Sequence, residues 1–316
     1  MTPKKQQHVA VLMGGWSNER EVSLVSGQAV CKALEELGHK VTAIDVQKDL
    51  QSIIQPLTGP HRPDVVFNAL HGRGGEDGVI QGVLDIIGIP YTHSGVTCSA
   101  LAMDKPLTKM TVSQYGIRCP EGKMVTREEL QKNGYPIAPP FVIKPPNEGS
   151  SVGVRIVQQG DNLDFVESDW NYGPEVLVEK FIPGHELTVA LLGDKGEARA
   201  LAVTELRPRN EFYDYKAKYT DGVTDHLLPA PIPSDVYDAC MRMAETSYRA
   251  LNCQGAARID IRWDDTKPGT TGLYFLELNT QPGLTPLSLV PEQAAYLNMP
   301  FKELISWMLE HPTRPE

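Results

Sequence analysis

Two apolar, strand-like segments near the end of the chain carry charged and polar residues at alternate positions. Arg258 and Asp260 are two residues apart in the first segment, and Glu277 and Asn279 are two residues apart in the second. Because side chains alternate between the faces of an extended chain, each pair shares one face of its strand. The turn-forming segment 264–269 between them would allow the strands to pair. Burying such groups among apolar residues is costly unless a ligand compensates for them.

If the two strands pair, Asp260, Glu277 and Asn279 converge as three hard oxygen ligands. Mg²⁺ prefers such ligands and is often held between protein carboxylates and substrate phosphates. The sequence therefore predicts a Mg²⁺ site with Arg258 beside it, followed directly by a Pro-Gly turn at 280–283 that can direct backbone N–H groups at a reacting centre. The alternative is a surface hairpin with a solvated polar face.

Length and composition indicate an ordinary soluble globular protein. A chain of 316 residues can form two or three domains. Its content of 41% hydrophobic and 22% charged residues is typical of that class. The formal net charge of −10 argues against nucleic acid as the main partner, because a phosphate backbone requires a basic surface.

The cysteines and the N-terminus indicate a reducing compartment. Five cysteines are scattered along the chain without CxxC spacing, so neither a disulfide framework nor a zinc site is expected. The apolar segment 8–13 gives way at once to Gly14 and Gly15, so we expect no signal peptide and no membrane span. These features predict a cytoplasmic protein.

The N-terminal third alternates between strand and helix, as a parallel α/β layer requires. The predicted elements are a strand at 8–13, a helix at about 18–37, and strands at 40–46 and 64–70. Asn18 and Glu21 have the spacing of a capping box at the start of the helix. Glu19, in the first helical turn, offers a carboxylate at the sheet edge where α/β sheets place ligands. Its alternative role is to compensate the helix dipole.

A glycine loop, residues 71–78, follows the third strand and contains four glycines. Glycines allow the backbone to approach a ligand closely, and the loop faces the same sheet edge as Glu19. His71 opens this loop and is a catalytic candidate, although a histidine in such a loop more often has a structural role.

The middle third places two lysines near a possible phosphate site. Lys105 begins a helix, and Lys144 ends the apolar strand 141–143. The Gly/Ser loop 148–153 follows and can wrap phosphate oxygens as anion-binding nests do, although it lacks the Walker A pattern. The alternative is an ordinary hairpin tip.

The strand at 175–181 leads to a hinge at Pro183 and Gly184, where backbone edges can pair with an adenine and Glu186 can hold ribose hydroxyls. The polar and aromatic segment 211–219 has the character of a lid. Its Lys216 and Lys218 can reach a phosphate, and its Tyr219 can cover a substrate. Helices predicted at 234–251 and 301–309 have no evident catalytic group and are expected to pack.

Seven motifs in chain order carry a resemblance to a known family: GGWSNEREVSL, ALHGRGGEDG, MDK, VIKPPNEGSSVG, FYDYKAKY, ARIDI and LELNTQPGLTPLSLVP. They closely resemble D-alanine:D-alanine ligases of the ATP-grasp superfamily, in the family's order and over nearly the whole chain. The resemblance implies an α/β fold of three domains, a Rossmann-like parallel-sheet domain at 1–93 and two ATP-grasp subdomains at 94–182 and 183–316. ATP would lie between two antiparallel sheets of the second and third domains.

The resemblance also implies roles for individual residues. The ATP site would comprise Lys105, Lys144, Ser151 and Lys218 at the phosphates and Glu179, Lys180, Ile182 and Glu186 at adenosine. Two Mg²⁺ ions, replaceable by Mn²⁺, would be bound by Asp260, Glu277 and Asn279. Arg258 and the Gly283 N–H would stabilise an oxyanion. Glu19, linked through Ser150 to Tyr219, would pair with the first ammonium, and Ser288 and Leu289 would bind the second substrate.

The implied activity is the ligation of two D-alanine molecules to D-alanyl-D-alanine for peptidoglycan precursor synthesis, releasing ADP and phosphate. A first carboxylate would attack the γ-phosphate of ATP, and a second D-alanine would displace phosphate from the acyl phosphate. The expected partners are these small molecules and a second copy of the chain in a homodimer, with no membrane. Two alternatives stay open: a D-alanine:D-lactate or other D-amino-acid ligase, against which Tyr219 in the lid position argues, and a nucleotide-binding protein without ligase activity.

Overall fold

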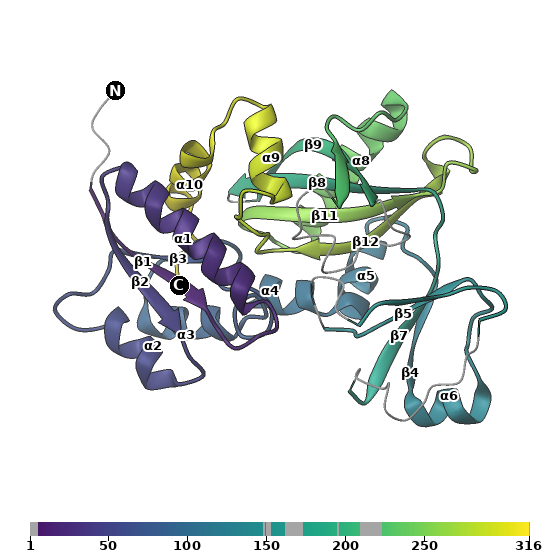
Figure 1. Cartoon of the computed structure of the whole chain (residues 1–316), viewed down its shortest axis with the longest axis horizontal. Helices are drawn as coiled ribbons and strands as arrows, with labels where there is room; N and C mark the ends of the chain where they lie inside the picture. The colour runs from purple at the N-terminus through teal and green to yellow at the C-terminus, as the bar shows by residue number, and fades with distance from the viewer. Residues whose placement is uncertain are drawn as a thin grey trace.

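The computed structural model describes residues 6–147, 149, 153–161, 173–194, 196–208 and 223–315. These residues form three sheets flanked by helices, which follow one another along the chain (Figure 1). The cysteines are all free thiols. Among the described residues, no helix has both the length and the apolar character needed to cross a membrane.

The first sheet is parallel, with the strand order β2-β1-β3, as the alternation of strand and helix predicts. Its strands are β1 (His8–Gly14), β2 (Lys40–Val46) and β3 (Val65–Asn68). The accompanying helices are α1 (Arg20–Glu36), α2 (Leu50–Leu57) and α3 (Val79–Ile87). β1 lies in the centre and is buried along nearly its whole length, because both neighbours and helices cover it.

The start of α1 differs from the predicted capping box. The N-cap residue is Glu19, one position after Asn18, and its side chain makes no capping hydrogen bond. Instead, Ser17 Oγ accepts a hydrogen bond from the Glu19 N–H at 3.1 Å and donates one to the His71 carbonyl at 2.6 Å. The predicted capping box at Asn18 and Glu21 is therefore wrong, because Ser17 connects the start of the helix to the glycine loop. The Glu19 carboxylate is directed toward Gly72.

The central sheet is antiparallel, with the order β4-β7-β5-β6. Its strands are β4 (Gly122–Thr126), β5 (Phe141–Lys144), β6 (Arg155–Val157) and β7 (Glu175–Lys180). The helices of this region are α4 (Val96–Met103), α5 (Lys105–Ser113) and α6 (Arg127–Asn133). α5 begins at Lys105 because Asp104 accepts a hydrogen bond from the Leu107 N–H and caps the helix.

The third sheet is also antiparallel and has the order β10-β9-β8-β11-β12. Its strands are β8 (His185–Asp194), β9 (Glu197–Pro208), β10 (Thr224–Leu227), β11 (Gly255–Trp263) and β12 (Leu273–Asn279). The later helices are α8 (Ser234–Ala250), the short 3-10 helix η2 (Gly269–Gly272), α9 (Leu289–Tyr296) and α10 (Phe301–Glu310).

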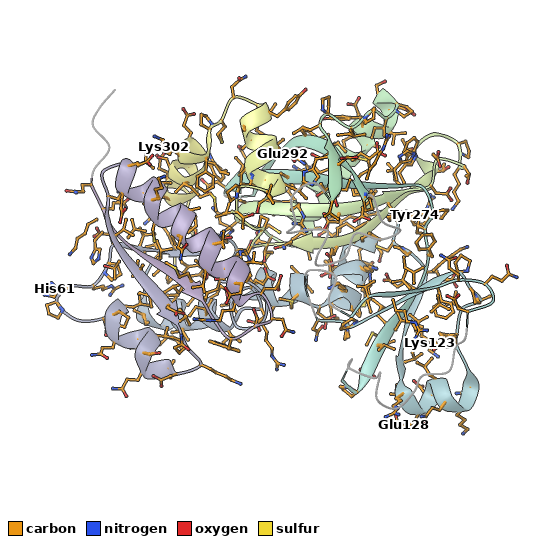
Figure 2. All side chains as sticks on the ribbon, in the orientation of Figure 1. His61, Lys123, Glu128, Tyr274, Glu292 and Lys302 are labelled. Carbon is orange, nitrogen blue, oxygen red and sulfur yellow. The ribbon has the colours of Figure 1, made fainter. Side chains whose placement is uncertain are left out.

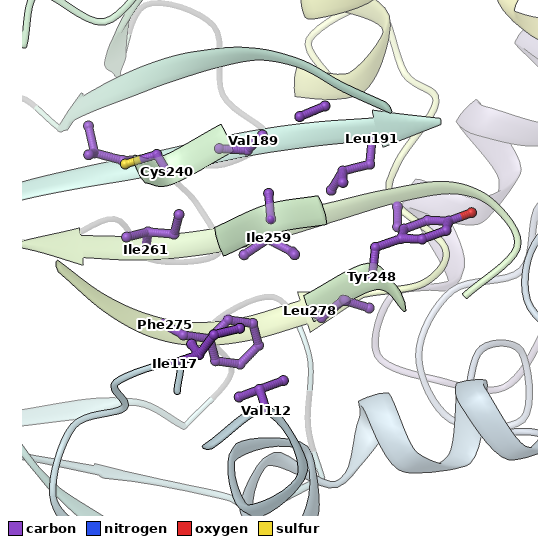
Figure 3. Packing of buried hydrophobic residues seen from close by; sticks show 14 of the residues in the cluster. Val112, Ile117, Val189, Leu191, Cys240, Tyr248, Ile259, Ile261, Phe275 and Leu278 are labelled. Atoms are coloured by element: carbon purple, nitrogen blue, oxygen red, sulfur yellow. The ribbon is translucent and has the colours of Figure 1, made fainter. Parts of the chain in front are cut away.

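The hydrophobic clusters do not correspond one to one with the three sheets. On one face of the third sheet, residues of α8 such as Cys240 and Tyr248 pack with Ile259 and Leu278, and Val112 of α5 joins the same cluster (Figure 3). On the other side, a second cluster combines α9 and α10 with β1, β3 and α1. α10 therefore lies beside α1 (Figure 1), and the end of the chain completes the core of its beginning.

Candidate functional site

The three parts of the chain meet around a pocket. Its walls come from the start of α1, the glycine loop, the junction of α4 and α5, and the end of β12. The lining residues are Glu19, His71, Glu76, Ala102, Met103, Lys105, Gly149, Arg258, Glu277, Leu278, Asn279, Thr280 and Gly283. Lys123, Glu128 and Lys302, by contrast, lie at the outside of the molecule (Figure 2). The pocket thus joins seven of the predicted site residues.

The predicted pairing of the two polar strands is confirmed. β11 and β12 are antiparallel, with Asp260 opposite Glu277 and Arg258 opposite Asn279. The polar residues therefore lie side by side across the hairpin, as their alternation in the sequence indicates.

A β-bulge in β12 keeps this polar face separate from the core. The register passes from Asp260 opposite Glu277 to Ile261 opposite Phe275, so Leu276 is the extra residue. Simple alternation would place Phe275 on the same face as Glu277. The bulge instead allows Phe275 and Leu278 to enter one hydrophobic cluster while Glu277 lines the pocket.

The carboxylates of the hairpin are matched by nearby cations. Arg258 donates from Nε and Nη2 to the two oxygens of Asp260 at 2.9 and 2.8 Å. Thr188 Oγ1 donates to Asp260 Oδ1 at 2.8 Å. Lys105 Nζ lies 3.2 Å from Glu277 Oε2. The Arg258 guanidinium is therefore held in a fixed orientation beside the pocket, since a two-point ion pair restricts both its position and its plane.

A second charged group lies at the central sheet, where Glu179 binds two lysines. Lys144 Nζ lies 2.6 Å from Glu179 Oε2, and Lys109 Nζ pairs with Glu179 Oε1. Burial, reinforced by repulsion from Lys144, lowers the pKa of Lys109 to about 8. Burial opposes ionisation of Glu179 as well, but the two ammonium groups outweigh it and lower the pKa of this carboxyl. Lys144 is thus fixed in position, and the role of Glu179 at adenosine stays a prediction.

Sequence reasoning missed Lys109. A signal was present, because Lys109 follows Lys105 by four residues and therefore lies on the same side of α5. What the sequence did not reveal is that its partner would be Glu179, on another element of the chain.

The hinge after β7 is held by Arg262. Its Nε donates to the Ile182 carbonyl at 3.1 Å, and its Nη2 donates to the Gly184 carbonyl at 2.9 Å. Nη1 lies 3.3 Å from Glu186 Oε2. The exposed Lys180 precedes this group. The predicted adenosine-binding residues Lys180, Ile182 and Glu186 are therefore gathered at the junction of the central and third sheets.

Two carboxyl groups, Glu19 and Glu76, share the N-terminal side of the pocket. Both are buried. Glu76 Oε1 accepts a hydrogen bond from the Gly72 N–H at 3.0 Å, while Oε2 has no hydrogen-bond partner among the described residues. Burial and then repulsion from Glu19 raise the pKa of Glu76 well above its usual value. Glu76 is thus a pocket-lining residue with a raised pKa, which the sequence of the glycine loop did not reveal.

His71 lines the pocket as a neutral imidazole. Its Nε2 lies 3.3 Å from Ser26 Oγ, which also accepts a hydrogen bond from the Leu284 N–H at 3.3 Å. Complete burial lowers the pKa of His71 to about 4. The side chain therefore links α1 to the turn after β12, and its predicted catalytic role stays a prediction.

We expect the free energy of unfolding to fall as the pH drops from about 6.5 toward 4. Burial lowers the pKa of both His71 and His93 to about 4. Above pH 6.5 neither the folded nor the unfolded chain protonates these rings. Below it, the unfolded chain binds protons that the folded chain excludes, at a cost of about 1.4 kcal/mol per pH unit for each histidine.

Urea unfolding between pH 4.5 and 7.5 measures this slope. His71→Gln should remove about half of the contribution of the two rings, whereas His61→Gln, at an exposed position on the outside of the molecule (Figure 2), should leave the slope unchanged. Equal slopes for the wild type and His71→Gln would contradict the assignment of His71 as a buried neutral ring.

The turn after β12 contains the predicted oxyanion donor and second-substrate residues. Gly283 lines the pocket, and a Cβ at this position would lie 2.8 Å from Ser288 Oγ, so only glycine fits there without a shift of the serine. Ser288 Oγ accepts a hydrogen bond from the Thr285 N–H at 2.9 Å. The Leu289 side chain is buried against Leu206, so its observed contact is with the core. Four other predicted site residues lie outside the described residues: Ser150, Ser151, Lys218 and Tyr219.

The predicted Mg²⁺ ligands suit that ion chemically. Asp260, Glu277 and Asn279 offer two carboxylates and one amide oxygen on neighbouring strands, and Mg²⁺ takes its remaining ligands from water and substrate phosphates. Within the part of the chain that the structure describes, no three His, Cys, Asp or Glu residues form a metal-binding group. Two carboxylates and one amide oxygen, which leave positions for water and phosphate oxygens, fit Mg²⁺ shared with a phosphorylated substrate.

Comparison with known proteins agrees with this architecture. The family model described as "D-ala D-ala ligase N-terminus" matches residues 8–58 and 51–94, and that described as "D-ala D-ala ligase C-terminus" matches residues 108–310. A D-alanine--D-alanine ligase of Rhizorhabdus wittichii is 53% identical over 308 residues, covering 96% of each chain. One of Caulobacter vibrioides is 49% identical, covering 98% of this chain and 94% of the relative.

Solved structures extend the similarity to three dimensions. The D-alanine--D-alanine ligase of Bacillus anthracis complexed with ATP has a TM-score of 0.77 and 30% identity, covering 98% of this chain and 97% of that one. The VanG D-Ala:D-Ser ligase of Enterococcus faecalis has a TM-score of 0.80 and 28% identity, covering 97% and 99%.

The parallel sheet followed by two antiparallel sheets, with lysines and carboxylates between them, defines an ATP-grasp protein. The chain belongs to the D-alanine:D-alanine ligase family.

Proposed function

We propose that the chain joins two D-alanine molecules to D-alanyl-D-alanine at the cost of one ATP, releasing ADP and phosphate. The observation that carries this proposal is the pocket in which Glu19 from the first domain faces Lys105, Arg258 and Glu277 from the other two. Carboxylates suit an ammonium, and cations suit phosphate and carboxylate groups. The family supports the same activity.

In the first step, the carboxylate of the first D-alanine attacks the γ-phosphorus of ATP and ADP leaves, giving an acyl phosphate. Glu19 holds the ammonium of this substrate. Lys105 and Lys144, with Ser151 and Lys218, bind the phosphates. Asp260, Glu277 and Asn279 would hold Mg²⁺, or Mn²⁺ in its place, and the bound ion would supply positive charge at the phosphates. Phosphoryl transfer depends mainly on such positioning and charge compensation.

In the second step, the free amine of a second D-alanine attacks the acyl carbon, and phosphate leaves from the tetrahedral intermediate. Arg258, oriented by Asp260, and the Gly283 N–H stabilise the oxyanion that develops on the former carboxylate. The neutral His71 can orient a substrate without adding charge. Ser150 links Glu19 to Tyr219, which covers the substrate.

The remaining assignments concern the outer parts of the site and the domains. Adenosine lies along the hinge at Glu179, Lys180, Ile182 and Glu186, and the second D-alanine lies near Ser288 and Leu289. We place the domain boundaries at 93 and 182, each between the last strand of one sheet and the first strand of the next. Since ATP is a substrate and the cysteines are free thiols, we place the reaction in the cytoplasm.

We also propose a homodimer that buries the exposed face of α3. Val79 and Ile86 are seven residues apart on one side of this helix and are 55% and 89% exposed. Ile86→Asp should shift the protein from dimer to monomer in sedimentation equilibrium, while Leu50→Asp, at an exposed apolar position on α2, should not. A wild-type chain that sediments as a monomer would contradict this part of the proposal.

The activity is tested by supplying ATP with D-alanine and measuring phosphate release together with the mass of the product. D-Alanyl-D-alanine and equimolar phosphate are expected. Reactions with L-alanine, D-serine or D-lactate beside D-alanine identify the second substrate. ATP hydrolysis without a dipeptide, or preferential formation of an ester with D-lactate, would contradict the proposal.

A further inference from the structure

A buried pair of amide side chains joins the first domain to the turn that carries Gly283. Asn68 ends β3 and is fully buried, and Gln281 follows β12 and is 1% exposed. Asn68 Nδ2 donates to Gln281 Oε1 at 2.8 Å across 213 residues of sequence. Gln281 lies in the chain between the pocket-lining Thr280 and Gly283, and Asn68 precedes the pocket-lining His71 by three residues, so the contact joins the two segments that carry these walls.

Each amide also holds the backbone of the opposite or adjacent wall. Asn68 Nδ2 donates to the Gly75 carbonyl at 3.0 Å, and Asn68 Oδ1 accepts from the Leu70 N–H at 3.2 Å. Gln281 Nε2 donates to the Leu70 carbonyl. Thus Gln281 binds the residue directly before the glycine loop, and Asn68 binds a carbonyl within the loop.

Gln281 is connected to the other wall as well. Its backbone N–H donates to Asn279 Oδ1 at 2.8 Å, and Gly283 follows two residues later. Movement of Gln281 therefore changes the position of Asn279 and of the Gly283 N–H at once. These two groups have distinct tasks in the proposed reaction, at the metal and at the oxyanion.

Buried amides are costly unless their hydrogen bonds are made, and a network with its partners in place favours one geometry. Apolar packing between the two walls would hold them together but would tolerate sliding. The directed bonds of Asn68 and Gln281 instead fix the relative position of the walls.

We infer that Asn68 and Gln281 are positioning residues that align the first-substrate wall, with Glu19, His71 and Glu76, to the wall bearing Asn279 and Gly283. The inference rests on the proposed function, because alignment matters only if one substrate touches both walls. Neither side chain touches the substrate in this scheme.

The first test compares Gln281→Met with Gln293→Met. Gln293 is a matched control because it is fully buried and its amide makes three hydrogen bonds, to Ala190, Thr188 and Thr204, all within the third sheet and α9. Misalignment of reacting groups by about 1 Å can lower a rate about a hundredfold. We expect Gln281→Met to lower kcat about 10- to 100-fold with KM for ATP changed less than about twofold, and Gln293→Met to retain kcat.

Unfolding measurements separate alignment from stability. Asn68→Leu, Gln281→Met and the double variant form a thermodynamic cycle. The double variant should be less destabilised than the sum of the single ones, because neither side-chain amide of the pair is left facing an apolar group. Its kcat should nevertheless stay low. Where Gln281→Met does not fold, Gln281→Asn, one methylene shorter, retains the amide and gives the same comparison.

Hydrogen exchange tests the alignment without ligation. Gln281→Met should speed amide exchange in residues 70–76 of the opposite wall, whereas Gln293→Met should not. Unchanged exchange there, a normal kcat for Gln281→Met, or an equal loss of kcat in Gln293→Met would overturn the inference. If the wild-type chain makes no dipeptide, the proposed function is overturned. Faster exchange at residues 70–76 in Gln281→Met but not in Gln293→Met would still support the alignment of the two walls.

Discussion

Glu277→Gln is expected to abolish ATP turnover dependent on D-alanine, by at least about a hundredfold, while the fold stays intact. The change keeps the shape of the side chain and removes one negative charge from a site where Asp260 and Glu277 lie opposite each other on paired strands. Substitution of groups that merely support a metal ligand already costs about 10- to 100-fold. Loss of a charged group should cost at least as much, because Lys105 then loses a counter-charge and the proposed Mg²⁺ site would lose a carboxylate.

Phosphate release at saturating ATP measures this effect, and a Mg²⁺ titration should move to higher concentration. Glu197→Gln is the matched control, since Glu197 is an exposed glutamate at the start of β9 in the same sheet. Near-normal phosphate release by a folded Glu277→Gln variant would remove Glu277 from the proposed metal site.

Glu19→Gln is expected to raise KM for the first D-alanine about 10- to 100-fold and to change KM for the second far less. Hydrogen bonds to charged groups contribute about 1.5–3 kcal/mol, which corresponds to this range. Glu19 is buried beside Gly72 and Gly149, so water cannot easily replace the lost charge. Removing an interaction made equally in the ground state and the transition state raises KM without lowering kcat.

Steady-state kinetics that resolve the two subsites measure the difference. Glu21→Gln is the control, because Glu21 is exposed on the same helix two residues later. Equal effects on both D-alanine constants, or an effect confined to the second, would mean that the first ammonium is bound elsewhere. Glu76 is the nearest alternative, since it shares this side of the pocket.

Local patterns in the sequence were sufficient to predict several elements, such as β1, α1 and β2, and the polar hairpin. Alternation placed Arg258 with Asp260, and the turn formers after them predicted the antiparallel pairing with Glu277 that the structure has. The same rule was incomplete at Leu276, because a bulge depends on what lies on both faces of the sheet. The sequence contains no local sign of that requirement.

Tertiary contacts account for the residues that the sequence did not reveal. The raised pKa of Glu76 arises from burial and from Glu19, which belongs to another element. The bond between Asn68 and Gln281 spans 213 residues. Even the capping box failed for this reason, since Ser17 is engaged by the His71 carbonyl. Periodicity reports which face a residue occupies, but it does not report which distant residue it meets.

The buried pair of Lys109 and Glu179 also connects the central sheet with the third sheet. α5 is anchored to the third sheet, because Val112 packs into that sheet's core, whereas Glu179 belongs to the central sheet. The pair thus joins the central sheet to α5, and through α5 to the third sheet. If the two sheets separated, Glu179 would keep Lys144, which is on its own sheet, and Lys109 would exchange its buried partner for water. Because burial lowers the pKa of Lys109 to about 8, the paired state holds its proton less tightly than a lysine in water, whose pKa is about 10.4. Separation of the two sheets would expose Lys109 and would therefore become less favourable as the solution becomes more alkaline.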